Sequence, residues 1–183
     1  MEKHEKKRYM RCDVKLMGML IVIVSCTLIG CKYSLKYSLR LNDLRIIKRM
    51  INMLKGEIKY KSSLLEEAFE SMKDKFNKPY SDFLHSISSE LSSGDMIYEE
   101  IVLSGLEIIR KNTALSNKDI ERISQVLNNL GYLDKEMQLI SMNMYLEELE
   151  ESEKEASLDV SKNGKLFKIL GVFTGLFICI FMM

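Results

Sequence analysis

Few residues of this 183-residue chain have side chains suited to catalysis or metal binding, because it contains only two histidines and four cysteines. Asp82 and His85 stand three residues apart in an expected helix, which is half of the carboxylate and histidine motif that holds iron in some helical bundles. That motif uses glutamate and requires a second copy, and the sequence has no second copy. We therefore interpret Asp82 and His85 as an exposed polar pair.

The cysteines do not form a recognisable site either. Cys26, Cys31 and Cys179 lie in apolar runs, Cys12 lies in a basic tail, and no C-x-x-C pair occurs. A zinc site, a redox pair and a secreted disulfide framework are therefore not indicated. The sequence also lacks a glycine-rich phosphate loop and a Ser/His/Asp arrangement. We expect no enzyme activity, no metal or other cofactor and no small-molecule substrate.

The elements that hold these residues are expected to be helices. The chain is 46% hydrophobic and 29% charged, which excludes a disordered polymer, a fibre and a nucleic-acid-binding tail. One proline and nine glycines are too few for a fold rich in strands and turns. The composition therefore predicts an all-α protein.

Two uncharged apolar segments, residues 16–31 and 169–183, are predicted to be transmembrane helices. At about 1.5 Å per residue they cover roughly 22–24 Å, and flanking lysines can extend them by snorkelling toward the ~30 Å hydrocarbon core. The predicted organisation is a basic tail that could precede a true start at Met10, a first span, a helical domain and a second span: residues 1–14, 15–32, 33–165 and 166–183.

The first apolar segment allows an alternative. Lys6, Lys7 and Arg8 precede the apolar stretch, which ends in Leu-Ile-Gly-Cys at Cys31. This is the layout of a bacterial lipoprotein signal peptide, in which Cys31 would be acylated and the domain would lie outside the cell. The second apolar segment has no evident use in a lipoprotein.

The basic residues near the two apolar segments indicate an orientation. The domain side carries ten Lys/Arg close to the segments, against six in the N-terminal tail and none after the last residue. Because basic residues favour the cytoplasmic side, we expect both termini outside the cytoplasm and the domain inside it. Five lysines near the membrane are expected to contact anionic lipid headgroups rather than nucleic acid, at about 1 kcal/mol each: Lys32, Lys36, Lys162, Lys165 and Lys168.

The middle of the chain is predicted to be a bundle of about six helices. In the first helix, apolar residues step by three and four from Leu44 through Ile47 and Ile51 to Ile58. Further helices are expected after residue 64, from Pro79 to Gly94, over 96–111, from about 117 to Gly131, and from Asp134 onward. The methionines in these stripes are expected in the core, and the last helix is expected to face inward with Met137, Ile140 and Met144. Met50 and Met72 belong to the same expected core.

The first and last helices of the domain have complementary charge. Residues 32–61 contain nine Lys/Arg and two acids, net +7, while residues 146–159 contain seven acids and one lysine, net −6. Both helices must return to one membrane, so we expect them to be antiparallel neighbours with exposed ion pairs worth about 0.2–1 kcal/mol each. The alternative is that the two charged faces are solvated separately.

The order of these parts resembles the stage III sporulation protein AB family of spore-forming bacteria. The resemblance lies in KLMG at 15–18, SCTLIG at 25–30, LLEEA at 64–68, LSNKD at 115–119 and LGYLDKEMQ at 130–138, with a terminal apolar helix. The segment LGYLDKEMQ is similar to the family pattern LGxSDxxxQ. The chain departs from the family at Leu133, at Tyr98, where tryptophan is usual, and in its basic tail.

The resemblance implies a cytoplasmic six-helix antiparallel bundle between two membrane helices, similar to the platform protein of type II secretion systems. It implies a scaffold of the channel that links mother cell and forespore, located in the mother-cell membrane around the forespore. The implied partners are the cytoplasmic ATPase of that machine and its other membrane proteins. The alternative is a surface lipoprotein, acylated at Cys31, with an extracytoplasmic helical binding domain.

The turn before the last helix contains our partner-binding candidates, Gly131, Asp134 and Gln138. We expect Gly131 to have positive φ at a helix end and Asp134 to cap the next helix, so both have structural reasons to be present. Gln138 follows one turn later without an evident local task, although the family pattern has glutamine there. Its amide is therefore the leading candidate for a hydrogen bond to another chain.

Overall fold

The computed structural model describes residues 2–61 and 64–182, although some side chains in the two terminal segments are outside the described part. The described residues form six α-helices and no strand, which confirms the all-α prediction. The helices are α1 (Glu2–Gly56), α2 (Leu65–Met72), α3 (Tyr80–Ser93), α4 (Tyr98–Asn112), α5 (Asn117–Tyr132) and α6 (Lys135–Met182), with a π-helical turn η1 (Glu57–Lys61) after α1 and a 3₁₀ turn η2 (Lys73–Lys75) after α2.

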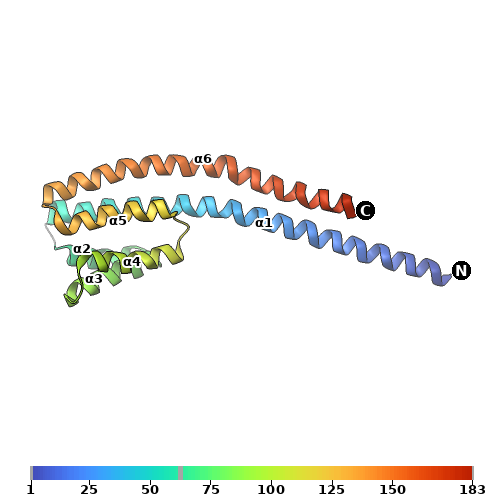
Figure 1. The fold of residues 1–183 in the computed structure, drawn as a ribbon, viewed down its shortest axis with the longest axis horizontal. Helices are drawn as coiled ribbons and strands as arrows, with labels where there is room; N and C mark the ends of the chain where they lie inside the picture. The colour runs from blue at the N-terminus through green and yellow to red at the C-terminus, as the bar shows by residue number, and fades with distance from the viewer. Residues whose placement is uncertain (1, 62–63, 183) are drawn as a thin grey trace. The chain divides into compact units, whose positions relative to one another are not determined.

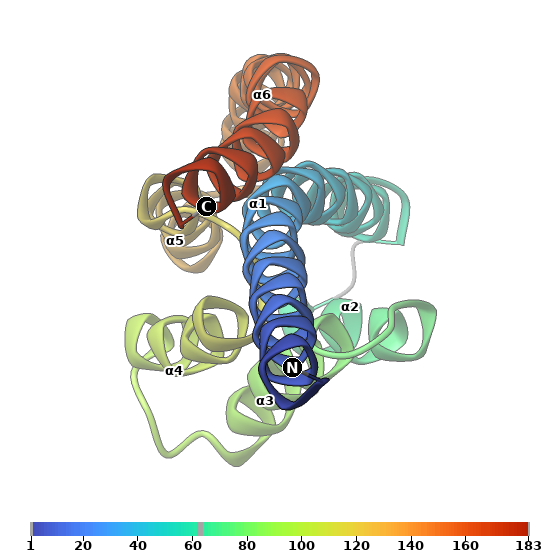
Figure 2. The ribbon, with the colours of Figure 1, turned by 90° about the vertical axis from the view of Figure 1, so that its right-hand side faces the viewer.

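The chain divides into two units. Residues 39–156 form a helical bundle, and residues 1–38 with 157–183 form the second unit. Within the bundle, the C-terminal part of α1, α5 and the N-terminal part of α6 form one layer, and α2, α3 and α4 form the other (Figures 1 and 2). The connections α1–α2, α3–α4 and α5–α6 all lie at the same end of the bundle (Figure 1). The six-helix bundle expected from the sequence is therefore present.

The core of the bundle follows the apolar stripe of α1. Leu44, Ile47, Ile51, Leu54 and Ile58 are all buried, as the spacing predicts. Each such side chain contributes roughly 1.5–3 kcal/mol of hydrophobic stabilisation. Met50 and Met72 are also buried, which confirms both as core residues.

The inward face of α6 differs from the prediction. Met137, Ile140 and Met144 are 47%, 50% and 60% exposed, so the expectation that they face the core is wrong. The buried residues of α6 are instead Met142, Tyr145, Leu149, Ser152 and Ala156. These positions also step by three and four, and α6 therefore has two apolar stripes, of which the other one packs into the core.

The helix ends agree with the sequence in most places. α3 ends at Ser93, and Gly94 follows with φ of 69°, the left-handed conformation expected of a helix-ending glycine. α5 begins with a capping box: the Ser116 hydroxyl accepts a hydrogen bond from the Asp119 amide, and the Asp119 carboxylate accepts one from the Ser116 amide. Such caps contribute about 0.5–2 kcal/mol each.

The expected charge pairing of the first and last helices is also present. The Lys48 ammonium lies 3.0 Å from a carboxylate oxygen of Glu153 and 3.1 Å from one of Glu150. The hydrogen bond to Glu153 is the main cause that raises the pKa of Lys48. α1 and α6 are therefore neighbours with complementary charge in the bundle.

Two buried carboxylates, Asp119 of α5 and Asp43 of α1, attach α1 to α5, to α3 and to the segment that joins α4 and α5. Arg40 donates two hydrogen bonds, of 2.8 and 3.0 Å, to Asp119, whose side chain is 3% exposed. Asp43 accepts hydrogen bonds of 2.8 Å from the Tyr80 hydroxyl and from the Ala114 amide. Arg40, which the sequence suggested only as one of the basic residues beside the membrane, thus helps to hold the bundle together.

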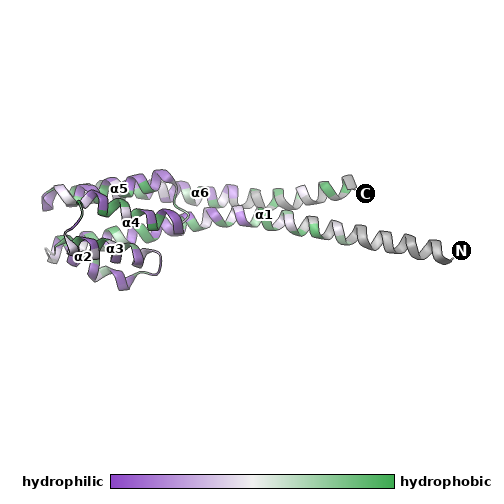
Figure 3. Cartoon of the chain, turned by 60° about the horizontal axis from the view of Figure 1, so that its bottom comes forward, coloured by the Kyte–Doolittle hydropathy of each residue, from purple (hydrophilic) through white to green (hydrophobic). Residues whose placement is uncertain are grey.

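The two predicted membrane segments belong to α1 and α6, which continue without a break into the bundle. Large apolar side chains are exposed in both segments, among them Leu28, Ile29, Phe173 and Phe177. Figure 3 shows hydrophobic residues in green along the described parts of α1 and α6. In the part of the chain that is described, no helix combines the length and the apolar character needed to cross a membrane. Many side chains of the two segments lie outside that part, and their membrane insertion stays a prediction.

Candidate partner-binding site

The corner between α5 and α6 contains the three partner-binding candidates. Gly131 lies in the last turn of α5, Asp134 stands just before α6, and Gln138 lies in the first turn of α6. The structure gives each of them a contact within the bundle.

Gly131 is required by a neighbouring ring rather than by its own backbone. It lies inside α5, and Gly94 has the only positive φ among the described glycines, so the positive φ expected at Gly131 is wrong. A β-carbon at Gly131 would lie 2.4 Å from Cδ1 of Tyr98, a distance that no carbon pair tolerates without movement. The glycine therefore allows the Tyr98 ring to pack directly against α5.

Tyr98 is fixed in this position by a hydrogen bond. Its hydroxyl donates to the carbonyl oxygen of Leu127 at 2.9 Å. Burial, with a smaller effect from Tyr132, raises the pKa of Tyr98, so its hydroxyl remains a donor at physiological pH.

Asp134 caps α6, and Gln138 connects α6 to α5. Oδ1 of Asp134 accepts a hydrogen bond of 3.0 Å from the amide of Met137, which confirms Asp134 as the cap of α6. The Gln138 side-chain amide donates a hydrogen bond of 2.7 Å to the carbonyl oxygen of Leu130, near the end of α5. The expectation that Gln138 lacks a local task is therefore wrong, and its contact with another chain stays a prediction.

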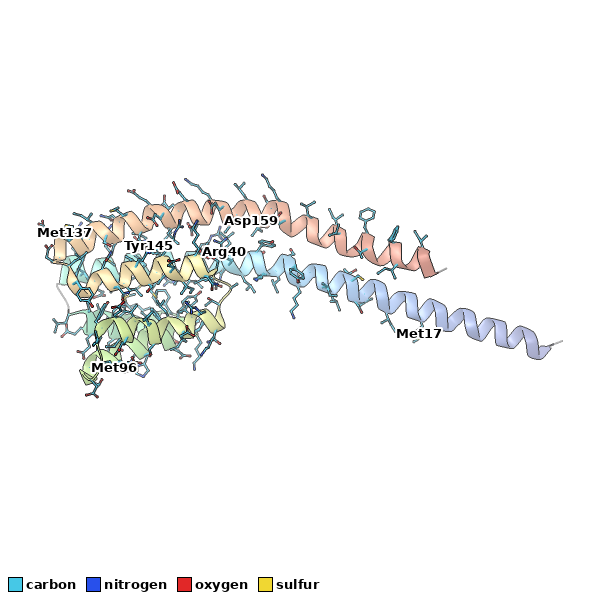
Figure 4. The ribbon with its side chains drawn as sticks, viewed as in Figure 1. Met17, Arg40, Met96, Met137, Tyr145 and Asp159 are labelled. Atoms are coloured by element: carbon cyan, nitrogen blue, oxygen red, sulfur yellow. The ribbon has the colours of Figure 1, made fainter. Side chains whose placement is uncertain are left out.

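A groove opens next to this corner, between α5 and α6. Its volume is about 270 Å³. The buried side chains of Val126 and Tyr145 form its floor, and Leu133, Met137, Ile140 and Met144 form its apolar wall. Figure 4 shows Met137 at the start of α6 and Tyr145 two turns later. The edge of the groove is polar and consists of Arg122, Gln125, Asn129, Ser141 and Glu148.

The charge around the groove is uneven. Arg122 donates a hydrogen bond of 2.8 Å to the Ser152 hydroxyl and lies 3.6 Å from a carboxylate oxygen of Glu148. Beyond Glu148, α6 exposes Glu151 and Glu155 to solvent. Beyond the end of the groove at Glu148, α6 thus continues into an exposed acidic stretch.

The residues considered for chemistry do not assemble into a site. The Asp82 carboxylate lies 3.4 Å from the Lys78 ammonium, and His85 is exposed. Within the described ranges, no three His, Cys, Asp or Glu side chains are grouped so that they could hold a metal ion.

The five lysines expected at lipid headgroups are only partly described. Lys32, Lys36 and Lys162 are exposed, as contact with headgroups requires. The side chains of Lys165 and Lys168 lie outside the described part of the chain. Lipid contact by these lysines stays a prediction.

Two features of the bundle, one of them at the site, were missed by the sequence analysis. The capping box at Ser116 and Asp119 had a local signal, because Ser-x-x-Asp before an apolar run is the pattern of such a box. The contact between Tyr98 and Gly131 joins residues 33 positions apart and had no local signal.

Comparison with known proteins relates all but the first 14 residues of the chain to one family. Residues 15–183 match the model of the family described as stage III sporulation protein AB. The chain is 25% identical over 170 residues to the stage III sporulation protein AB of Bacillus subtilis (strain 168), which covers 93% of this chain and 99% of that protein. A solved structure of stage III sporulation protein AB has a similar fold, with a TM-score of 0.61 and 22% identity over 67% of this chain and 96% of that chain.

Proposed function

The chain belongs to the stage III sporulation protein AB family, and we propose that within its role in sporulation it is a non-enzymatic membrane scaffold of a secretion-like channel between mother cell and forespore. The carrying observation is the extent of the family match, which includes both apolar segments and the bundle between them. A match over both apolar segments as well as the bundle supports a function in which the segments take part.

The proposed location is the mother-cell membrane around the forespore, crossed twice. The uncharged runs 16–31 and 169–183 and the exposed apolar side chains in both support this proposal. The exposed lysines Lys32, Lys36 and Lys162 lie next to these runs, where anionic headgroups would attract them. The excess of basic residues on the domain side supports a cytoplasmic bundle.

The proposed partners are the cytoplasmic ATPase of the same channel and its other membrane proteins. A scaffold needs a rigid body between its anchor and its partners. The ties from Arg40 to Asp119 and from Asp43 to Tyr80 and Ala114 support such a body, since they attach α1 to distant parts of the bundle.

A surface lipoprotein remains the second candidate because the thiol of Cys31 is free and exposed. In that case the chain would be cleaved before Cys31, the cysteine would be acylated, and the bundle would lie outside the cell. The lipoprotein predicts that Cys31→Ala abolishes spore formation, whereas the scaffold predicts that Cys31→Ala leaves it unchanged.

The proposal is tested by deleting the gene and counting heat-resistant spores after complementation. We expect the full chain and Cys31→Ala to restore spore formation equally. A chain shortened to residues 1–165 should accumulate to the same level on an immunoblot and fail to restore it. Normal spore counts with residues 1–165, or loss of both acylation and spores in Cys31→Ala, would contradict the scaffold.

A further inference from the structure

The helix α6 has an apolar stripe that the bundle does not use. Met142, Tyr145 and Leu149 fill the core side, while Met137, Ile140 and Met144 are about half exposed on the side toward the groove. These three residues step by three and four and therefore lie on one face of the helix. Large apolar side chains gathered on one exposed face mark an interaction site more often than scattered ones do.

The groove beside this stripe has a polarity pattern that suits an amphipathic helix. Its floor is apolar and buried, and its edge is polar, which is the usual arrangement of a protein interface. An amphipathic helix binds such a groove through apolar side chains at i, i+3 and i+7. The hydrogen bond that Asp134 accepts from the Met137 amide and the one that Gln138 donates to Leu130 fix the adjoining corner, so little ordering is needed when a partner binds.

The acidic continuation of the same face identifies the charge of the partner. Glu147, Glu151 and Glu155 follow Met144 at i+3, i+7 and i+11, and all three are exposed. Neighbouring acids have basic partners in the bundle: Lys48 contacts both Glu150 and Glu153, and Arg122 contacts Glu148. In the described part of the chain, no ion pair neutralises Glu147, Glu151 or Glu155. Like charges four residues apart cost a few tenths of a kcal/mol, which a basic partner would relieve.

We infer that the groove between α5 and α6 binds an amphipathic helix of another protein, whose apolar stripe covers Met137, Ile140 and Met144 and whose basic residues pair with Glu147, Glu151 and Glu155. The site spans the 19 positions from residue 137 to 155, about 27 Å or five helical turns. The inference rests on the proposed scaffold role, since it names the chemistry of one partner that the scaffold holds.

A second copy of this chain is a poorer occupant of the groove. Parallel pairing of two α6 helices would place the acidic stretch of one against the acidic stretch of the other. Antiparallel pairing that matches Met137 with Met144 would carry Glu151 and Glu155 past the start of the other α6. Neither arrangement neutralises these acids, whereas a basic helix does.

Two synthetic peptides test the inference on the full-length chain in lipid nanodiscs. Both are stapled, fluorescein-labelled helices with leucines at i, i+3 and i+7, followed by three lysines in one and three glutamates in the other. Fluorescence anisotropy should give a Kd at least about tenfold lower for the lysine peptide. Raising the salt concentration should weaken that binding, because the acids are exposed.

Variants of the chain locate the binding. Met144→Glu should raise the Kd of the lysine peptide by about tenfold or more. The matched control is Leu103→Glu, which changes a similarly exposed apolar residue on α4 and should leave the Kd unchanged. Reversing the three acids together, E147K, E151K and E155K, should exchange the preference so that the glutamate peptide binds more tightly. Circular dichroism establishes that each variant remains folded.

Three results would overturn the inference. The first is equal binding of the two peptides, and the second is a loss of binding that is the same in Met144→Glu and Leu103→Glu. The third is the formation of disulfide-linked dimers by a Met144→Cys chain without its native cysteines, which would identify a second copy in the groove. These measurements do not depend on spore formation. A chain that binds the lysine peptide but is dispensable for spores would count against the scaffold role and not against the groove.

Discussion

The ring of Tyr98 packs against Gly131 so closely that a β-carbon at residue 131 would lie 2.4 Å from the ring atom Cδ1. This contact joins the start of α4 to the end of α5, and the Tyr98 hydroxyl completes it with its bond to Leu127. The corner where the sequence suggested a partner site is thus first a packing site of the bundle.

Substitution of Gly131 should destabilise the bundle because the Tyr98 ring cannot move without losing its hydrogen bond. Gly131→Ala is expected to cost about 1–3 kcal/mol, and Gly131→Val more. Thermal unfolding of the full chain in detergent, followed by circular dichroism, measures the effect.

Gly56 provides the matched control for this prediction. A β-carbon there meets nothing within 4 Å, and Gly56 ends α1, so Gly56→Ala should leave stability unchanged or raise it slightly. When Tyr98 is replaced by Leu, Gly131→Ala should destabilise the bundle less, because the ring that the β-carbon would meet is absent. If Gly131→Ala has the same melting temperature as the wild type, the close contact does not exist in solution.

Gln138→Ala should lower stability by about 1 kcal/mol, since the carbonyl of Leu130 would lose its side-chain donor. Gln138→Glu should cost at least as much, because an ionised carboxylate has no proton to donate. Asn143→Ala, at an exposed amide of the same helix, is the control and should have no effect. A wild-type melting temperature for Gln138→Ala, together with impaired spore formation, would restore the earlier hypothesis that Gln138 serves only another chain.

The pair of Arg40 and Asp119 should make stability depend on pH in the acid range. Burial alone would raise the pKa of Asp119, but the hydrogen bonds from Arg40 and Ser116 outweigh it and lower the pKa below the ordinary 3.8. A group with a lowered folded pKa stabilises the fold above its unfolded pKa, and this contribution is lost as the pH falls through the folded pKa. Urea unfolding should therefore show a loss of stability below about pH 4.

Asp119→Asn should remove this part of the pH dependence and cost about 1.5–3 kcal/mol at neutral pH, the range for hydrogen bonds to charged groups. Asp95→Asn, at an exposed aspartate in the α3–α4 connection, should change neither quantity. The same acid profile in Asp119→Asn as in the wild type would assign the acid loss to other carboxylates.

The fold was predictable to the extent that local patterns specify it. The stripe from Leu44 to Ile58 has one apolar face, and that face is buried. α6 has two apolar faces at helical spacing, and the sequence alone does not tell which one meets the core. The face with Met142, Tyr145 and Leu149 is buried, and the face with Met137, Ile140 and Met144 is not. Which of the two is buried depends on how α5 and α1 pack against α6, which is a tertiary property.

The candidate site was predictable only in its local part. The Asp134 cap acts within one helical turn, and the sequence indicated it correctly. The role of Gly131 depends on Tyr98, which belongs to the neighbouring helix α4. The role of Gln138 depends on Leu130, which precedes the turn between α5 and α6. Arg40 and Asp119 are 79 residues apart, and no pattern within either helix pairs them.

The lysines near the apolar segments should bind anionic lipid. The fragment 32–165 is expected to bind vesicles that contain anionic lipid, more weakly as salt rises, and hardly at all to neutral vesicles. Replacing Lys32, Lys36, Lys162 and Lys165 by glutamine should remove about 1 kcal/mol of binding per lysine. Equal sedimentation with neutral and anionic vesicles, or tight DNA binding at physiological salt, would contradict the lipid assignment.

The side of the membrane on which the bundle lies is the most direct test of the scaffold. Ser93 is exposed at the end of α3, and a Ser93→Cys chain without its four native cysteines offers a single thiol there. An impermeant maleimide applied to sporulating cells should label this thiol only after permeabilisation, because the scaffold account places the bundle in the cytoplasm. Equally strong labelling in intact cells would contradict that account and favour a bundle exposed outside the cell.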